Sequence, residues 1–143
     1  MVGKRAISKT AIVPSDAAAL DRYVPDLANW SNTWRYEQDD VPVGERIVES
    51  FKPFLVDLVH QGLARKTLRR HRDNLWMLGG EIIKRRQLDP DLARLTVAEA
   101  LLELIDESGG PLISGGASES QQNDFDATCR KLYRFVFSSP ASD

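Results

Sequence analysis

The amino-acid sequence predicts an all-α protein, a compact four-helix bundle that carries an irregular or short-helical N-terminal extension. From Val43 onward, apolar residues recur at spacings of three, four and seven, which places them along one side of a helix. The segments 96–99 and 118–121 have the Thr/Ser-x-x-Glu/Gln pattern of a capping box, which is typical of a helix start. Few segments show the alternation that indicates strands. These observations together predict helices packed on helices.

The apolar pattern predicts four helices, over about 43–61, 65–86, 97–105 and 118–137. The second of them contains Gly79 and Gly80 near its middle, where each glycine costs about 1 kcal/mol relative to alanine. We expect another helix to cross closely at these glycines.

The first 42 residues are less regular, because three prolines interrupt them. We expect residues 1–42 to form a partly disordered extension whose first dozen residues lack structure, with a short helix starting near Ser15 or Asp16. In that extension Trp30 and Trp34 are four residues apart, so on a helix they share one face, and we expect them to cover the core from outside. The predicted four-helix domain is 43–138, followed by a tail, 139–143.

Composition favours one domain in a reducing compartment. A chain of 143 residues with 42% hydrophobic residues is long enough to bury a core. No apolar run approaches the roughly 18 residues of a membrane-spanning helix, and no apolar segment follows the basic N-terminus. The single cysteine, Cys129, excludes an intramolecular disulfide. We therefore expect a cytoplasmic protein that makes no membrane contact.

The charges are distributed unevenly along the chain, although the formal net charge is only -2. The stretch 61–86 has eight basic and two acidic residues, whereas 87–143 has four basic and ten acidic residues. The net charge of the whole chain is therefore a poor guide to what its middle part binds.

Signals for catalysis are weak, and we predict no enzyme activity, no metal and no cofactor. His60 and His71 lack the i, i+4 spacing of helical metal ligands. The segment HRDN, starting at His71, is similar to the catalytic loop of protein kinases, but the chain is too short for that fold and has no DFG segment. We expect His71 at the edge of the core.

The basic residues at the start of the second predicted helix are the strongest functional signal: Arg65, Lys66, Arg69, Arg70 and Arg72. A helix N-terminus already carries partial positive charge, so each cation there is unfavourable by about a few tenths of a kcal/mol. Together with the hydroxyl of Thr67 and the free N–H groups of the helix, these cations suit a phosphate backbone. The alternative is a solvated face that pairs with the acidic C-terminal half or with Asp39 and Asp40. Composition alone leaves both interpretations open.

The order of these motifs resembles the N-terminal core-binding domain of tyrosine recombinases and phage integrases, a SAM-like helical domain that helps to clamp DNA. Members of that family have a first helix ending in a Phe-x-x-x-Leu-type segment, a short Gly-Leu turn, a Thr-led second helix and two more helices. The chain shows FKPFLVDLVHQGLARKTLRRHRDNLWMLG for the first part and QQNDFDATCRKLYRFVF for the last, so the resemblance covers about residues 45–137. The family's catalytic residues belong to a second domain and are not matched, since Tyr133 lies inside the fourth predicted helix.

The resemblance implies DNA-backbone contacts from the start of the second helix, at Lys66, Thr67, Arg69 and Arg70. It also implies that a region of the last helix can face DNA, with Arg130, Lys131 and Arg134 as candidates. The acidic C-terminal half and the aromatic N-terminal extension depart from the family pattern.

The sequence therefore predicts a non-enzymatic DNA-binding protein resembling an integrase core-binding domain, such as an accessory factor of a mobile element. Contacts would be mainly to phosphates, with weak sequence preference. A partner recombinase or a homodimer is compatible with this role. The alternative is a protein-interaction module or homodimer in which opposite charges meet and the tryptophans form part of the contact.

Overall fold

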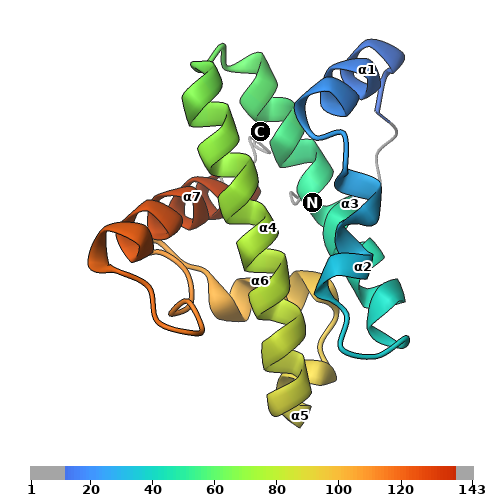
Figure 1. Ribbon diagram of the computed structural model, residues 1–143, viewed down its shortest axis with the longest axis vertical. Helices are drawn as coiled ribbons and strands as arrows, with labels where there is room; N and C mark the ends of the chain where they lie inside the picture. Colours follow the sequence, from blue (N-terminus) through green and yellow to red (C-terminus); the bar gives the residue numbers. More distant parts are fainter. Residues whose placement is uncertain (1–11, 138–143) are drawn as a thin grey trace.

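The computed structural model describes residues 12–137, and within that range the chain folds into seven α-helices and no strand, which confirms the all-α class (Figure 1). The helices and the single 3₁₀ turn follow one another as α1 Pro14–Tyr23, η1 Leu27–Asn29, α2 Trp30–Trp34, α3 Asp40–His60, α4 Arg65–Leu88, α5 Pro90–Ala93, α6 Val97–Leu104 and α7 Glu119–Phe137. We expected the first dozen residues to lack structure and residues 139–143 to form a tail. Both segments lie almost wholly outside the described residues.

The four predicted helices correspond to α3, α4, α6 and α7. The start of α3 lies three residues before the predicted one, and the end of α4 lies two residues beyond it. Both capping boxes form: Thr96 and Glu99 exchange bonds of 2.9 and 3.1 Å, and Ser118 and Gln121 exchange bonds of 2.9 and 3.0 Å. Local sequence signals thus determine where these helices begin.

The two longest helices, α3 and α4, form a hairpin that organises the molecule. Gly62 adopts a φ of +68°, a backbone conformation that favours glycine, and thereby allows the chain to turn between them. Figure 1 shows α1 and α2 on one side of this hairpin and α7 on the other, with α6 near its lower half. The shared core includes the fully buried side chains of Phe51, Phe54 and Phe125.

The N-terminal segment is part of this core. Its buried apolar side chains are Leu20, Val24, Leu27, Trp30 and Trp34. The two tryptophans do share a face, with ring centroids 5.8 Å apart, but they are only 2% and 5% exposed. The expectation that they cover the core from outside is therefore wrong: α2 packs against both α3 and α4, and its two tryptophans are buried in the core.

The close approach expected at Gly79 and Gly80 is made by a side chain. A Cβ atom added to Gly79 would lie 2.1 Å from Cζ2 of Trp34. The indole N–H of Trp34 donates to the backbone oxygen of Trp76 at 2.9 Å, which holds the ring against the helix. Gly79 is required because the indole occupies the space of a Cβ.

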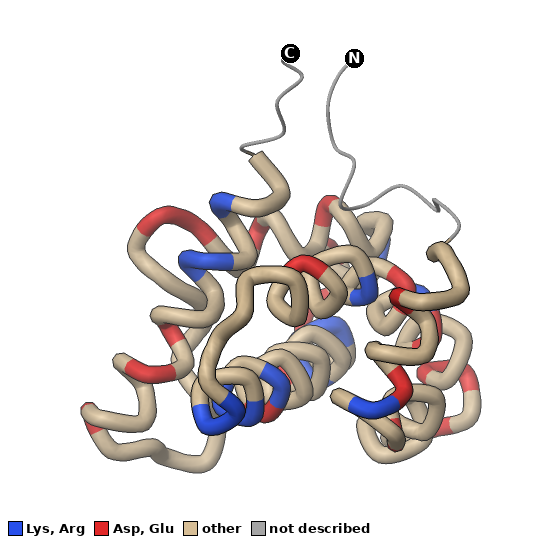
Figure 2. The backbone as a smooth tube through the Cα atoms, turned by 90° about the horizontal axis from the view of Figure 1, so that it is seen from above, with Lys and Arg blue, Asp and Glu red and all other residues tan. Residues whose placement is uncertain are grey.

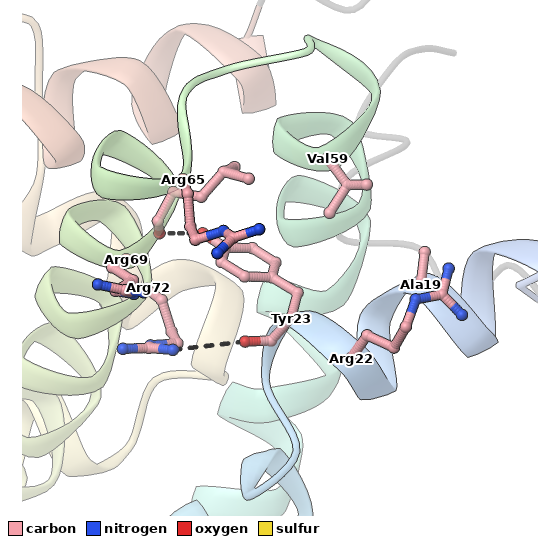
Figure 3. A pocket seen from close by; sticks show the side chains of 8 residues that line it. Ala19, Arg22, Tyr23, Val59, Arg65, Arg69 and Arg72 are labelled. Carbon is pink, nitrogen blue, oxygen red and sulfur yellow. Dashed lines mark hydrogen bonds between the residues drawn. The ribbon is translucent and has the colours of Figure 1, made fainter.

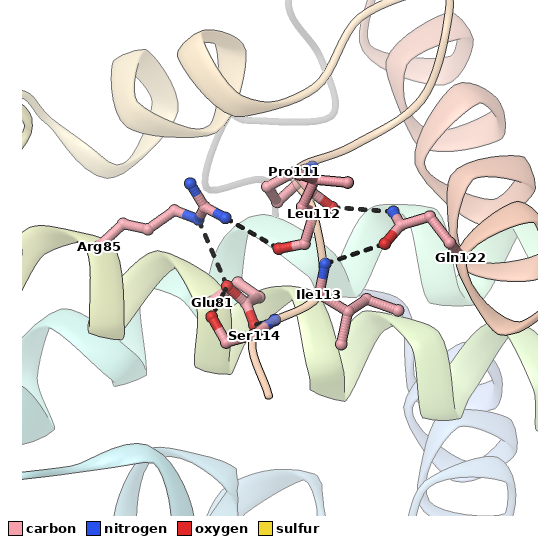
Figure 4. A network of polar contacts seen from close by, with 7 residues as sticks. All are labelled: Glu81, Arg85, Pro111, Leu112, Ile113, Ser114 and Gln122. Carbon is pink, nitrogen blue, oxygen red and sulfur yellow. Dashed lines mark hydrogen bonds and ion pairs between the residues drawn. The ribbon is translucent and has the colours of Figure 1, made fainter. Parts of the chain in front are cut away.

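The loop between α6 and α7 is tied to α4 by a buried carboxylate (Figure 4). Glu81 is 6% exposed and accepts hydrogen bonds from the backbone N–H and the hydroxyl of Ser114, at 2.8 and 2.9 Å. Arg85 forms an ion pair with Glu81 and also donates to the backbone oxygen of Leu112. Gln122, at the start of α7, donates to the oxygen of Pro111. The loop is thus held from both α4 and α7.

Candidate nucleic-acid interface

The N-terminus of α4 lacks the usual groups that compensate a helix dipole. The residue before it, Ala64, makes no side-chain capping bond, and no acidic residue occupies the first turn. Arg65 and Lys66 are both exposed there. Cations and free N–H groups therefore lie at the same end of the helix, a combination that attracts anions.

A hollow of about 370 Å³ lies beside this N-terminus, between α1, the end of α3 and α4. Eight residues line it, four of them arginines and none acidic: Ala19, Arg22, Tyr23, Val59, Arg65, Leu68, Arg69 and Arg72. Figure 3 shows Tyr23 in the middle of the group, with Arg22 on one side of it and Arg69 on the other. Two helices distant in the sequence thus contribute arginines to one hollow.

Tyr23 fixes the position of α1 against α4. Its hydroxyl donates to the backbone oxygen of Leu68, and burial raises the pKa of the phenol, so the group keeps its proton at neutral pH. Arg72 donates to the backbone oxygen of Tyr23 at 3.5 Å and pairs with Asp73 at 3.1 Å. Arg72 is therefore oriented by the protein itself.

The other three arginines of the hollow are available to a ligand. Within residues 12–137, no hydrogen bond or ion pair joins the side chain of Arg22, Arg65 or Arg69 to another described residue. Because none of the lining residues is acidic, their positive charge is not neutralised inside the hollow.

The remaining predicted residues of α4 do not join this hollow. Arg70 points to the other side of the helix and forms an ion pair of 3.3 Å with Asp124 of α7. Lys66 is exposed and Thr67 is half-buried. The solvated-face interpretation, in which the basic stretch pairs with the acidic C-terminal half, therefore holds for Arg70.

The three predicted cations of α7 are not brought together with the hollow. Arg130 donates to the backbone oxygen of Ser108 at 3.4 Å, which directs it toward the α6–α7 loop. Lys131 lies close enough to His71 to affect its pKa, so it is near the Arg70 side of α4. Arg134 is exposed in the last turn of α7.

A buried polar cluster joins α4 to α7 beneath these cations. Asn74 donates to the hydroxyl oxygen of Thr128 at 2.8 Å, and Thr128 lies 2.8 Å from Nδ1 of His71. Because Asn74 uses only one lone pair of the hydroxyl oxygen, the proton of Thr128 is free to be donated to an unprotonated Nδ1. Burial, together with Lys131 and Arg70, lowers the pKa of His71 and favours this neutral form. At 9% exposure, His71 lies at the edge of the core, as expected.

The described residues show no arrangement typical of metal or thiol chemistry. No group of three or more His, Cys, Asp or Glu side chains in residues 12–137 is placed to hold a metal ion. Cys129 is buried, and burial raises its pKa, which keeps the thiol protonated and unreactive.

Sequence reasoning missed Arg22 and Tyr23. They belong to a helix that the sequence did predict, but their contact with α4 spans more than 40 positions and depends on how α1 packs.

Figure 2 shows the blue Lys and Arg segments gathered along α4 in the lower centre, while red Asp and Glu segments are spread over the surrounding helices.

Across the part of the chain that is described, no helix is both long enough and apolar enough to cross a bilayer. Comparisons of the chain with protein-family models, with curated proteins and with solved structures give no match.

Proposed function

We propose that this chain is a non-enzymatic DNA-binding protein that resembles an integrase core-binding domain, with α4 supplying most of the phosphate contacts. The observation that carries the proposal is the set of cations at the start of α4 that have no acidic partner among residues 12–137: Arg65, Lys66 and Arg69. They surround an uncapped helix N-terminus, which favours contact with an anionic backbone.

This proposal narrows the surface that the sequence suggested. Arg70 already has Asp124 as a partner, and Arg130 is engaged with Ser108, so both contribute less than their sequence positions imply. The role of a mobile-element accessory factor, with or without a partner recombinase, belongs to the same proposal.

Fluorescence anisotropy with a generic duplex at several salt concentrations tests the proposal. We expect micromolar binding, with the logarithm of affinity falling linearly as the logarithm of salt concentration rises, by about 0.9 for each phosphate neutralised. The double variant Lys66→Gln Arg69→Gln should lower that slope by about one to two.

A matched control removes the same charge elsewhere. Arg35 and Arg46 are exposed residues of the α2–α3 region, and the double variant Arg35→Gln Arg46→Gln should keep the slope of the unmodified protein. An equal loss in both double variants would show that only overall charge matters and would contradict the assignment to α4.

The alternative function is an interaction module based on opposite charges, in which the tryptophans form part of the contact. The structure leaves fewer tryptophans for such a contact. Trp30 and Trp34 are buried and cannot contact a partner, whereas Trp76 is 44% exposed. Light scattering on the same sample separates the two functions: a dimeric mass without DNA binding at low salt would favour the interaction module.

A further inference from the structure

The hollow between α1 and α4 combines two kinds of surface. Its apolar part consists of Ala19, Val59, Leu68 and the ring of Tyr23, and its charged part consists of four arginines. A duplex backbone needs only an open cationic surface. A hollow with an apolar wall instead suits a small molecule that has an uncharged ring system as well as a charged group.

We infer that this hollow binds a ligand that combines a phosphate monoester or polyphosphate with a flat ring system, as a nucleotide does. Its volume of about 370 Å³ lies within the range of roughly 300–1,000 Å³ that small-molecule sites occupy. The inference goes beyond DNA binding, because it assigns a small ligand to residues that the DNA proposal does not need, Arg22 and Tyr23.

The choice of a phosphate rests on the arginines. Guanidinium groups match the oxygens of a phosphate in paired, charge-assisted hydrogen bonds. Arg72 is already oriented by Asp73 and by the backbone oxygen of Tyr23, while Arg22, Arg65 and Arg69 have no partner among the described residues. A terminal phosphate or a diphosphate neutralises more of this charge than a single bridging phosphodiester does.

The choice of a flat group rests on Tyr23. Its hydroxyl is bound to the backbone oxygen of Leu68, which holds the ring as one wall of the hollow (Figure 3). Aromatic and aliphatic walls of this kind favour a ring system over a bare inorganic ion.

Isothermal titration of the full chain with ADP, in the absence of divalent metal, tests the inference. Adenosine supplies the ring without the phosphate, and inorganic pyrophosphate supplies the phosphate without the ring. We expect ADP to bind about tenfold or more tightly than either. Absence of ADP binding at millimolar concentration, or equal binding of pyrophosphate, would overturn the inference.

Two variants locate the site. Arg22→Gln removes a cation from α1 only, and should weaken ADP about tenfold, whereas Arg35→Gln should leave its affinity unchanged. Ala19→Glu keeps all four arginines but places a carboxylate in the hollow, and should abolish binding. Circular dichroism checks that the variants fold. An unchanged affinity in Arg22→Gln, or the same loss in Arg35→Gln, would contradict the site.

The phosphate can come from a free nucleotide or from the 5′ end of a nucleic acid, and competition distinguishes these sources. If a 5′-phosphorylated oligonucleotide displaces ADP and its 5′-hydroxyl counterpart does not, the source is a nucleic-acid end. If neither does, it is a free nucleotide. Equal displacement by both would show that phosphodiesters fill the hollow, and would overturn the preference for a terminal phosphate.

Discussion

At the scale of single residues, the packing of Trp34 explains one of the two neighbouring glycines in α4, Gly79. Its indole lies where a side chain of residue 79 would be, but only touches the edge of residue 80. Two neighbouring glycines with the same helix propensity thus have different tertiary surroundings, and they give a controlled comparison.

We predict that Gly79→Ala destabilises the protein by about 1–3 kcal/mol, because the added Cβ would lie 2.1 Å from the Trp34 ring and force a shift. Gly80→Ala is the matched control. Its nearest atom, Cδ1 of Trp34, would be 3.4 Å away, so the gain in helix propensity should make it neutral or stabilising by up to about 1 kcal/mol. Urea unfolding measures both, and equal stabilities would contradict the packing described.

His71 is the residue whose protonation should affect stability most directly. Burial, Lys131 and Arg70 lower its pKa, and Asp124 opposes them. The unfolded chain therefore takes up a proton at a higher pH than the folded chain does, which favours unfolding as the pH falls below the usual value of about 6.5. The contribution of neutral His71 to the free energy of unfolding is therefore complete above that pH and is lost as the solution becomes more acidic.

We predict that the free energy of unfolding falls more steeply between pH 7.5 and 5.5 in the unmodified protein than in His71→Gln. One proton contributes at most about 1.4 kcal/mol per pH unit. Urea titrations of both proteins at the two pH values measure how much the free energy of unfolding changes in each. The contributions of the other titrating groups are the same in both proteins and cancel when the two changes are subtracted. Parallel losses in the two proteins would show that His71 does not carry this dependence.

At the scale of elements, α4 presents different chemistry on different sides. With about 100° between successive residues, Arg65, Arg69 and Arg72 lie within about 60° of one another, whereas Arg70 lies about 100° beyond Arg69. The first group faces α1 and the hollow, and Arg70 faces Asp124 on α7. One run of basic residues is thus divided between a free surface and an internal contact.

The loop between α6 and α7 depends on α4 through Glu81, and we predict that Glu81→Ala loosens it. The amide of Ser114 loses its acceptor, at a cost of about 1–3 kcal/mol, so its hydrogen exchange should become faster. The amide of Ile113 is bound to Gln122 and should respond less. Glu103→Ala, which changes an exposed carboxylate of α6, is the control. Unchanged exchange at Ser114 would contradict the anchoring role.

At the scale of the whole molecule, the N-terminal segment and the four long or capped helices share one core. Five apolar side chains between residues 20 and 34 are buried in it. Full burial of one such side chain is worth about 1.5–3 kcal/mol, while a whole domain is stable by only about 5–15 kcal/mol.

We therefore predict that a chain beginning at Arg35 does not fold cooperatively, although it retains the four helices that the sequence predicted. Thermal unfolding followed by near-ultraviolet circular dichroism, with the full chain as reference, measures this. A sharp transition in the shortened chain would show instead that the chain from Arg35 onward folds without the N-terminal segment.

The sequence by itself determined the all-α class and the position of the principal helices. Apolar spacing, the two capping boxes and Gly62 act within a few residues, so they can be recognised without knowing the fold. The basic start of α4 was visible for the same reason.

Tertiary structure alone decided which residues meet. Tyr23 bonds to Leu68, Arg70 pairs with Asp124, and Trp34 fills the space beside Gly79. Each of these contacts joins residues more than 40 positions apart, and it depends on the relative placement of whole helices. The physical reason is that helix periodicity sets the direction of a side chain, whereas the docking of helices sets its neighbours.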